Sequence, residues 1–494
     1  VTISALLFVT VVLLMYYVYI RLLDKYNFWK KKKVAFLKPI PLIGNFLPVL
    51  LLKSSMADVY SKAYWSYPEE KVVGAYNFLE PILILRDPNL IEKIIIKDFN
   101  HFEDQVTVAD DGGLLSYTLF QLKGNTWRSL RYKLNTCFTN NKLKQMFNQM
   151  LECTDELINN IGSNLKNDID IKDILSIYNA DITASCVFGI KLDRTANRIF
   201  SEMVLSIFDI KPLSIFRILI IMNFQKLANV LGLTFMPKHV DRYMRELIRK
   251  TLVQRTNCEQ KSNDFVQLLL NLKEKGYLEY KKDLNKEINP VDNIGKVLFA
   301  GGFDPVNNAM VFSLYEIARN PEIQENIRKE VKDILNKHGG SYTFEAIKEM
   351  VYLEQCIQET MRFFPLLPFL FRTCSRSYVT SDGLKIDKGQ KLAIPLTALH
   401  MDHQYFPEPH KFDPHRFDTV SGYNTNTYLP FGGGPRSCLG MKFAMVEMKL
   451  GLAKIIEKYK FRLSPKTKLP LELNKQAFFN KPKYEIYLNF ERLI

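Results

Sequence analysis

The chain has 494 residues, of which 47% are hydrophobic and 24% are charged, and its formal net charge is +15. This composition predicts a globular protein with a large apolar core and excludes a disordered or fibrous chain. The seven cysteines include no CxxC pair, which excludes zinc-ribbon sites, argues against a disulfide scaffold and indicates a reducing compartment. The positive charge favours an anionic membrane surface or an acidic protein partner, and no nucleic acid is expected because no compact basic motif follows residue 33.

The first 20 residues, VTISALLFVTVVLLMYYVYI, carry no charge and are numerous enough for a helix that spans a bilayer. Arg21, Lys25 and the four lysines at 30–33 follow. Because lysine and arginine collect on the cytoplasmic side of a membrane helix, the sequence predicts a transmembrane anchor over residues 1–22 with the remaining chain in the cytoplasm. The stretch has neither the positive start nor the small-residue cleavage site of a signal peptide.

After the anchor, the proline- and glycine-rich stretch LKPIPLIGN indicates a stiff connector, so we assign residues 23–45 to a basic connector. Residues 46–494 show no repeat and no low-complexity linker, and we assign them to one domain. Within it, the β-rich runs at 71–77 and 81–87 predict a hairpin.

Helical periodicity dominates from about residue 88 to 365, and one helix is predicted over 345–364, ending at Pro365. Residues 205–235 are unusually apolar, which fits either a buried helix or a segment that rests on a membrane or lines a path for apolar substrates. A last helix is predicted at about 439–459 and a strand at 484–490. The fold class is therefore mainly α with small β-sheets.

The stretch FGGGPRSCLG at 431–440 surrounds one arginine and one cysteine with glycine. Cys438 lies just before the last predicted helix, where the positive potential and free N–H groups of a helix start favour a thiolate. The glycines permit turns and close approach, and Arg436 can hold an acid near the sulfur. A thiolate, room for a flat ligand and an arginine for its acidic edge are typical of haem bound through sulfur.

Two other interpretations of the same stretch are weaker. A glycine-rich loop before a helix can bind phosphate, but GGGPRS lacks the Lys-Ser/Thr ending of a P-loop. A cysteine with a lowered pKa can act as a nucleophile, but no histidine partner stands nearby in the sequence.

The pattern Phe431-x-x-Gly434-x-Arg436-x-Cys438-x-Gly440 resembles the cysteine loop of the cytochrome P450 family. The resemblance covers almost the whole chain, and it is closest to microsomal, insect-type members that metabolise foreign compounds, in the stretches 94–104, 122–131 and 406–417. It implies a P450-like single haem domain with haem b (iron protoporphyrin IX) as cofactor and Cys438 as the axial ligand of the iron. It also implies further haem contacts, namely Trp127, Arg131, Arg372, Arg436, Phe431, Gly432 and Gly440.

The resemblance extends to an ExxR motif at Glu359 and Arg362. Side chains three apart on a helix share a face and can pair, and an isolated ExxR most often marks a surface salt bridge. Here it precedes Pro414-His-Arg416-Phe417, and this order implies a buried structural network of Glu359, Arg362 and Arg416 that braces the cysteine loop. The four arginine and tryptophan haem contacts are implied to bind propionates, for which the planar guanidinium fork is suited.

The distal helix is predicted over 291–321, where Gly301, Gly302 and Asp304 resemble the small-residue turn and the catalytic acid of the family. The family's next residue is threonine, whose hydroxyl assists proton delivery to oxygen, but this chain has Pro305 there. Proline inside a helix costs about 3 kcal/mol or more, and the family's bend at this point is expected to absorb it. A water held by Asp304, a substrate hydroxyl, or Asn307 or Asn308 could replace the lost hydroxyl.

The resemblance implies a monooxygenase that inserts one oxygen atom from O2 into an apolar small molecule, with electrons from NADPH through NADPH–cytochrome P450 reductase and with cytochrome b5 as a further partner. The implied location is the endoplasmic reticulum membrane, with the catalytic domain on the cytoplasmic side. Pro305 keeps open an isomerase, dehydratase or peroxygenase on the same fold, and a third alternative is a haem protein that binds ligands without turnover. An apolar pocket is suggested by the aromatic residues Phe363, Phe364, Phe369 and Phe371.

Overall fold

The computed structural model describes residues 2–105, 119–208, 217–218, 220–221, 224–234, 237–256, 263–274, 290–418 and 425–493. The chain divides into two compact units. Unit 1 comprises Val1–Val106, Pro368–Asp402 and Asn426–Arg436, and unit 2 comprises Thr107–Leu367, His403–Thr425 and Ser437–Ile494. The chain therefore passes from unit 1 to unit 2 within the predicted cysteine loop.

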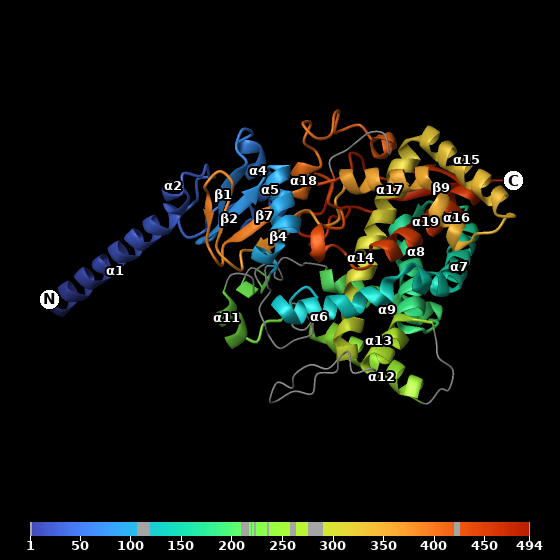
Figure 1. Ribbon diagram of the computed structural model, residues 1–494, viewed down its shortest axis with the longest axis horizontal. Coiled ribbons are helices and arrows are strands. Elements are labelled where there is room, and N and C mark those ends of the chain that lie inside the picture. Colours follow the sequence, from blue (N-terminus) through green and yellow to red (C-terminus); the bar gives the residue numbers. More distant parts are fainter. Residues whose placement is uncertain are drawn as a thin grey trace. The chain divides into compact units, whose positions relative to one another are not determined.

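Unit 1 contains a four-stranded sheet with the strand order β1-β2-β7-β4, whose strands lie side by side in Figure 1. The strands β1 (Val72–Asn77) and β2 (Glu80–Leu85) pair antiparallel, which confirms the predicted hairpin. β7 (Lys391–Ile394) runs parallel to β2, and β4 (Leu370–Thr373) runs antiparallel to β7. The other elements of unit 1 are α1 (Thr2–Tyr26), α2 (Phe28–Lys31), α3 (Leu47–Leu50), α4 (Met56–Ser66), α5 (Pro88–Glu92), η1 (Lys93–Lys97), η2 (Phe99–His101), β5 (Tyr378–Val379), β6 (Lys385–Ile386), α18 (Leu396–Leu399) and η6 (Gly434–Arg436).

The segment after α1 packs closely on the edge of this sheet. Trp29 is buried, and its indole Nε1 donates a hydrogen bond of 3.0 Å to the carbonyl of Ala75. The indole lies over Gly74, where any Cβ would come within 2.5 Å of the ring, so only glycine fits below it. Within the described residues, no helix combines the length and the hydropathy that a membrane crossing requires.

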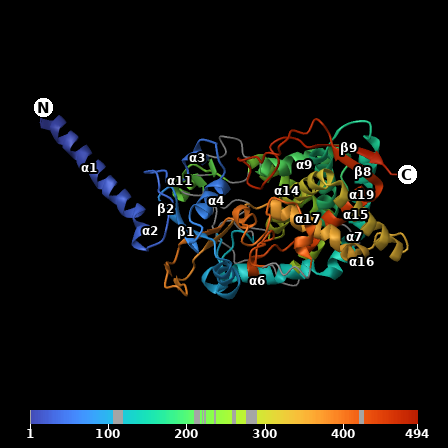
Figure 2. The ribbon, with the colours of Figure 1, turned by 90° about the horizontal axis from the view of Figure 1, so that it is seen from above.

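Unit 2 is mainly helical, and α14 (Pro290–Arg319) contacts α8, α17 and α19. Its three-stranded sheet has the order β3-β9-β8, and Figure 2 shows β8 and β9 side by side. The other elements of unit 2 are α6 (Gly124–Asn135), η3 (Thr136–Phe138), α7 (Asn140–Ser163), β3 (Ile169–Asp170), α8 (Ile171–Ile182), η4 (Thr183–Phe188), α9 (Arg194–Phe208), α11 (Gln225–Val230), α12 (Lys238–Thr256), α13 (Phe265–Glu274), α15 (Pro321–Lys337), α16 (Phe344–Glu349), α17 (Val351–Phe363), η5 (Pro414–Phe417), α19 (Met441–Lys458), β8 (Tyr459–Leu463) and β9 (Tyr487–Arg492).

The single helix predicted over 345–364 is wrong, because the chain forms two helices there. α16 ends at Glu349, and Met350, with φ −73° and ψ 81°, leaves the helical conformation before α17 begins. The carboxylate of Glu330 on α15 accepts hydrogen bonds from the N–H groups of Tyr352 (2.6 Å) and Leu353 (2.9 Å). A carboxylate from another helix thus satisfies the free N–H groups of a helix start in the middle of an apparently continuous pattern.

Candidate functional site

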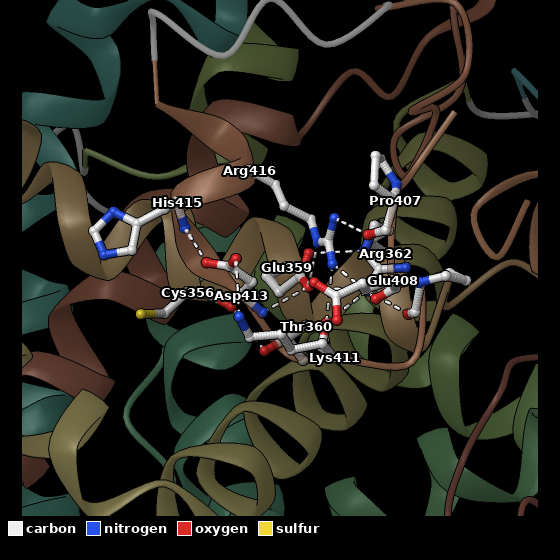
Figure 3. A network of polar contacts seen from close by, with 11 residues as sticks. Cys356, Glu359, Thr360, Arg362, Pro407, Glu408, Lys411, Asp413, His415 and Arg416 are labelled. Atoms are coloured by element: carbon white, nitrogen blue, oxygen red, sulfur yellow. Dashed lines mark hydrogen bonds and ion pairs between the residues drawn. The ribbon is translucent and has the colours of Figure 1, made fainter. Parts of the chain in front are cut away.

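A buried carboxylate in unit 2 gathers two arginines from separate segments (Figure 3). Arg362 Nε donates to Glu359 Oε2 at 2.8 Å and Arg362 Nη2 to Glu359 Oε1 at 2.9 Å, while Arg416 Nε donates to Glu359 Oε1 at 3.3 Å. The backbone N–H of Asp413 adds a bond of 2.9 Å to the same Oε1. The side chains of Glu359 and Arg362 have no exposed surface. Glu359, Arg362 and Arg416, the three residues of the predicted network, therefore lie together.

The outer ends of both guanidiniums hold the backbone of the segment before η5. Arg362 Nη2 donates to the carbonyl of Pro409 at 2.8 Å, and Arg416 Nη2 donates to the carbonyl of Glu408 at 2.8 Å. Burial raises the pKa of Glu359, and the hydrogen bonds and charges of the two arginines counteract part of this rise. Because the network is buried and its outer partners are backbone groups, its geometry fits the predicted structural role.

The thiol of Cys438 stands at the start of α19, which begins at Met441. One side of the residue is accessible to solvent, whereas protein atoms surround the rest of the thiol. Burial raises the pKa of Cys438, while the N–H groups of Gly440 and Met441 and the charge of Arg131 lower it by less. The N–H groups at the helix start thus lower the pKa of this thiol, as the sequence predicted, while burial acts in the opposite direction and has the larger effect.

The part of the loop that precedes the cysteine belongs to unit 1, and its shape depends on glycine. Gly434 has φ +65°, and a Cβ there would lie 1.9 Å from the carbonyl oxygen of Ile95. Arg436 is buried, and its Nε donates to the carbonyl of Glu103 at 2.9 Å. Gly432 also has positive φ, +72°, so the loop folds back twice in a way that side chains disfavour.

The surroundings of Arg372 on β4 show that unit 1 has a positive charge suited to an anionic ligand. Its side chain is buried, its Nε has no hydrogen-bond partner among the described residues, and its Nη1 donates to the carbonyl of Phe371 at 2.8 Å. Burial lowers the pKa of Arg372 to about 10. A buried guanidinium without a carboxylate is costly in the chain alone and suits a ligand that brings a carboxylate, as haem does.

In unit 2 the helix α6 carries Trp127 and Arg131 four residues apart, and therefore on one face. Trp127 is buried and Arg131 is half-buried. Burial lowers the pKa of Arg131, and the charge of Cys438 raises it, so these two groups are close enough to interact. Among the described residues, a Cβ added at Gly440 would have only Phe138 within 4 Å, at 3.8 Å, so there is space beside this glycine. A cysteine near an arginine, with this space next to it, fits the thiolate side of a haem site.

The helix α14 continues through Pro305 without a break. Position 305 has no N–H to donate to the carbonyl of Gly301. Among the described residues, a Cβ on Gly302 would meet nothing within 4 Å, and one on Gly301 would meet only Phe120, at 3.9 Å. Asp304, next to the proline, is buried. An uninterrupted helix thus presents two glycines, a buried acid and no hydroxyl at 305.

The two asparagines after Pro305 lie in different surroundings. Asn308 Nδ2 donates to the Asp304 carbonyl at 2.8 Å and to Asp304 Oδ1 at 3.0 Å. Asn307 instead contacts α8, where its Nδ2 donates to Ser176 Oγ at 3.0 Å and its Oδ1 accepts from Asn179 Nδ2 at 3.2 Å. The sequence offers both asparagines as candidates, and the i,i+4 spacing of Asp304 and Asn308 is the one signal in it that favours Asn308.

The four phenylalanines suggested for an aromatic pocket at 363–371 lie in two different units. Phe369 and Phe371 pack against Tyr60 in the core of unit 1, with ring centroids 5.2 and 5.8 Å from the tyrosine ring. Phe364 stacks on Phe312 of α14 at 4.3 Å in unit 2. The sequence also suggests that the apolar stretches at about 102–120 and 200–235 line the pocket, and of these residues 106–118 and 209–216, among others, lie outside the described residues.

In unit 2, a cysteine at a helix start and a long helix with two glycines and a buried carboxyl are the features expected of a haem-thiolate oxidoreductase. The family model for cytochrome P450 matches residues 34–490, and the chain belongs to the cytochrome P450 family. It is 32% identical to cytochrome P450 6B1 of Papilio polyxenes, over 94% of this chain and 95% of that protein. It is also 32% identical to cytochrome P450 6a2 of Drosophila melanogaster (95% and 96% covered) and 30% identical to cytochrome P450 6k1 of Blattella germanica (92% and 90% covered). The chain is thus a P450-type monooxygenase that uses haem.

Proposed function

We propose that this enzyme inserts one atom of O2 into an apolar small molecule and reduces the other to water, with NADPH as the electron source. The balanced reaction is RH + O2 + NADPH + H⁺ → ROH + H2O + NADP⁺. The observation that carries the proposal is the stretch of α14 in which two glycines without close neighbours precede the buried Asp304. Space for small molecules beside a group that can hold a proton is what oxygen activation requires.

Each site residue has a separate task in this proposal. Cys438 binds the iron through sulfur, and Arg372, whose buried charge has no acidic partner among the described residues, binds a haem propionate. Arg436, Arg131 and Trp127 complete the propionate contacts. Bound haem supplies the activation of O2, which electron donation from the thiolate favours. Asp304 moves protons toward the oxygen, and Gly301 and Gly302 leave room for it.

The electrons are proposed to come through NADPH–cytochrome P450 reductase, with cytochrome b5 as a second donor. The net charge of +15 supports acidic protein partners of this kind. Attachment to the endoplasmic reticulum membrane is supported by the exposed apolar side chains of α1, among them Leu6, Leu7, Phe8 and Leu13. We expect a chain that begins at residue 27, just before the buried Trp29, to lose sedimentation with lipid vesicles while keeping its fold.

Pro305 favours a second candidate, an isomerase, dehydratase or peroxygenase on the same fold. The NADPH-dependent reaction needs protons delivered to the oxygen, and residue 305 has no hydroxyl to assist this delivery. A substrate that already contains an O–O bond can react without external electrons. The two candidates differ in a single measurable requirement, the consumption of NADPH in proportion to product.

The test uses purified enzyme with reductase and a panel of apolar compounds, and compares wild type with Pro305→Thr and Pro305→Ala. NADPH consumed, organic product and hydrogen peroxide are measured together. Pro305→Ala is the matched control, because it restores the N–H without a hydroxyl. The monooxygenase proposal expects most NADPH to appear in wild-type product. If wild type gives mainly peroxide and Pro305→Thr, but not Pro305→Ala, restores product, the second candidate takes its place.

A further inference from the structure

The side chain of Asn308 holds both the backbone and the carboxylate of Asp304. It is fully buried, and its Nδ2 donates to the Asp304 carbonyl at 2.8 Å and to Oδ1 at 3.0 Å. Both partners can only accept when Asp304 is ionised, so the amide must present its NH2 group to them and its orientation is fixed. Two contacts to one residue leave the carboxyl of Asp304 little freedom to rotate.

The other end of the same amide is an acceptor without a donor. Asn308 Oδ1 is buried and has no hydrogen-bond partner among the described residues. An unsatisfied buried oxygen costs stability, and buried polar sites of this kind commonly hold an ordered water. The free acceptor lies one helical turn from Pro305, the residue that brings no hydroxyl to this helix.

We propose that Asn308 is the positioning residue for Asp304, and that it replaces the missing hydroxyl at 305. Its NH2 group keeps the Asp304 carboxyl group in one orientation, and its Oδ1 accepts a hydrogen bond from a water. The Asp304 carboxylate takes up a proton from solvent, and the carboxylic acid then passes this proton to the water on its way to the oxygen, so the pair returns to its ionised starting state. The inference rests on the proposed monooxygenase function.

The fate of the electrons reports on this proton delivery. When protons arrive in time, O2 + RH + 2e⁻ + 2H⁺ gives ROH + H2O, or, without an organic substrate, O2 + 4e⁻ + 4H⁺ gives 2 H2O. When they do not, O2 + 2e⁻ + 2H⁺ leaves as H2O2. The yield of peroxide per NADPH therefore measures how well Asp304 and Asn308 deliver protons, and the measurement requires no organic product.

Asn307 provides a matched control one position away. It is also a fully buried asparagine of α14 with two side-chain hydrogen bonds, but these go to Ser176 and Asn179 of α8. Asn307→Leu and Asn308→Leu remove the same group from the same helix, but only Asn308→Leu removes the two hydrogen bonds to Asp304.

The experiment compares wild type, Asn307→Leu, Asn308→Leu, Asp304→Asn and the double variant Asp304→Asn/Asn308→Leu, as full chains with haem and reductase. We measure peroxide per NADPH, the solvent deuterium isotope effect on NADPH oxidation, the optical spectrum of the ferric haem and the midpoint of thermal unfolding. Asn308→Leu is expected to raise the ratio of peroxide to fully reduced oxygen on the order of tenfold, the scale of one hydrogen bond to a charged group. Its isotope effect should rise, and its unfolding midpoint and ferric spectrum should match those of Asn307→Leu.

The double variant decides whether Asn308 acts through Asp304. If it does, Asn308→Leu adds nothing to the peroxide yield once Asp304 is already asparagine. Equal peroxide from Asn307→Leu, or additive effects in the double variant, would overturn the proposal in favour of a merely structural role. Absence of organic product from wild type would instead count against the proposed function, because the peroxide comparison does not depend on it.

Discussion

Replacing Glu359 by glutamine tests whether the buried carboxylate holds unit 2 together. The carboxylate accepts two bonds from Arg362, one from Arg416 and one from the Asp413 N–H, and its side chain has no exposed surface. Glutamine has nearly the same shape, but it leaves two guanidiniums without a counter-charge and turns an NH2 group toward donors. Removing one partner of a buried ion pair costs about 3–5 kcal/mol.

An exposed ion pair supplies the control for this substitution. Glu345 and Lys144 approach to 2.6 Å, closer than the ion pairs of Glu359 with Arg362 and Arg416, but their side chains are 51% and 57% exposed. Exposed pairs contribute about 0–1 kcal/mol, so Glu345→Gln should change stability little. The free energy of unfolding is obtained from denaturant titrations followed by circular dichroism, and haem retention is followed by absorbance. If Glu359→Gln costs no more than Glu345→Gln, the reasoning from burial is refuted.

A second prediction compares the loss of both partners of the buried Glu359–Arg362 pair with the loss of either one alone. Replacing Glu359 and Arg362 together by leucine leaves only the partly accessible Arg416 unpaired, so the double variant should be more stable than the sum of the two single losses predicts. The same denaturant titrations give this coupling free energy. Additive losses would indicate that the pair acts through packing alone.

Three further predictions concern separate parts of the chain. Burial raises the pKa of Asp181 to about 6, so the folded protein holds this proton more tightly than the unfolded chain does. The free energy of unfolding should therefore fall by on the order of 2 kcal/mol as pH rises from about 4 to about 6. Asp181→Asn should abolish this part of the fall when denaturation is measured as a function of pH. Arg372→Met should stabilise the haem-free protein by about 1–3 kcal/mol, because it removes an unpaired buried charge, and should weaken haem binding in a titration with haemin. Gly434→Ala should destabilise the protein by about 3 kcal/mol or more through its clash with the Ile95 carbonyl, whereas Gly383→Ala, with φ +81° and no atom within 4 Å of its Cβ, should show only the cost of about 1 kcal/mol for positive φ.

Features that depend on spacing along the chain were predictable from the sequence. The hairpin of β1 and β2, the last helix and the pairing of Glu359 with Arg362 all arise from residues close in the chain. The break between α16 and α17 was not predictable, because its cause is the Glu330 carboxylate of a third helix. The packing of Phe369 and Phe371 against Tyr60 was not predictable for the same reason, because the sequence shows their hydrophobicity but only the tertiary structure decides which residues they contact.

In the candidate site, too, some features were predictable from the sequence and others were not. The sequence identified Cys438, but its expected thiolate character rested on the helix start alone and omitted burial, which has the larger effect on the pKa. The contact of Arg436 with the Glu103 carbonyl had no signal in the sequence, because a backbone acceptor can belong to any residue type. Local electrostatics can therefore be inferred from a motif, whereas desolvation needs the packed chain around it.

Pro305 shows why structural tolerance and chemical competence have to be judged separately. The proline costs one hydrogen bond to the Gly301 carbonyl, yet α14 remains helical on both sides of it. The fold therefore gives no reason to expect a loss of catalysis, and the question passes to the hydroxyl that proline does not provide. The contacts of Asn308 with the carbonyl and carboxylate of Asp304 arise one turn later and use a side chain, so they do not depend on the missing N–H. A helix can thus lose a backbone donor and a catalytic hydroxyl at one position and still hold its acid in place from the next turn.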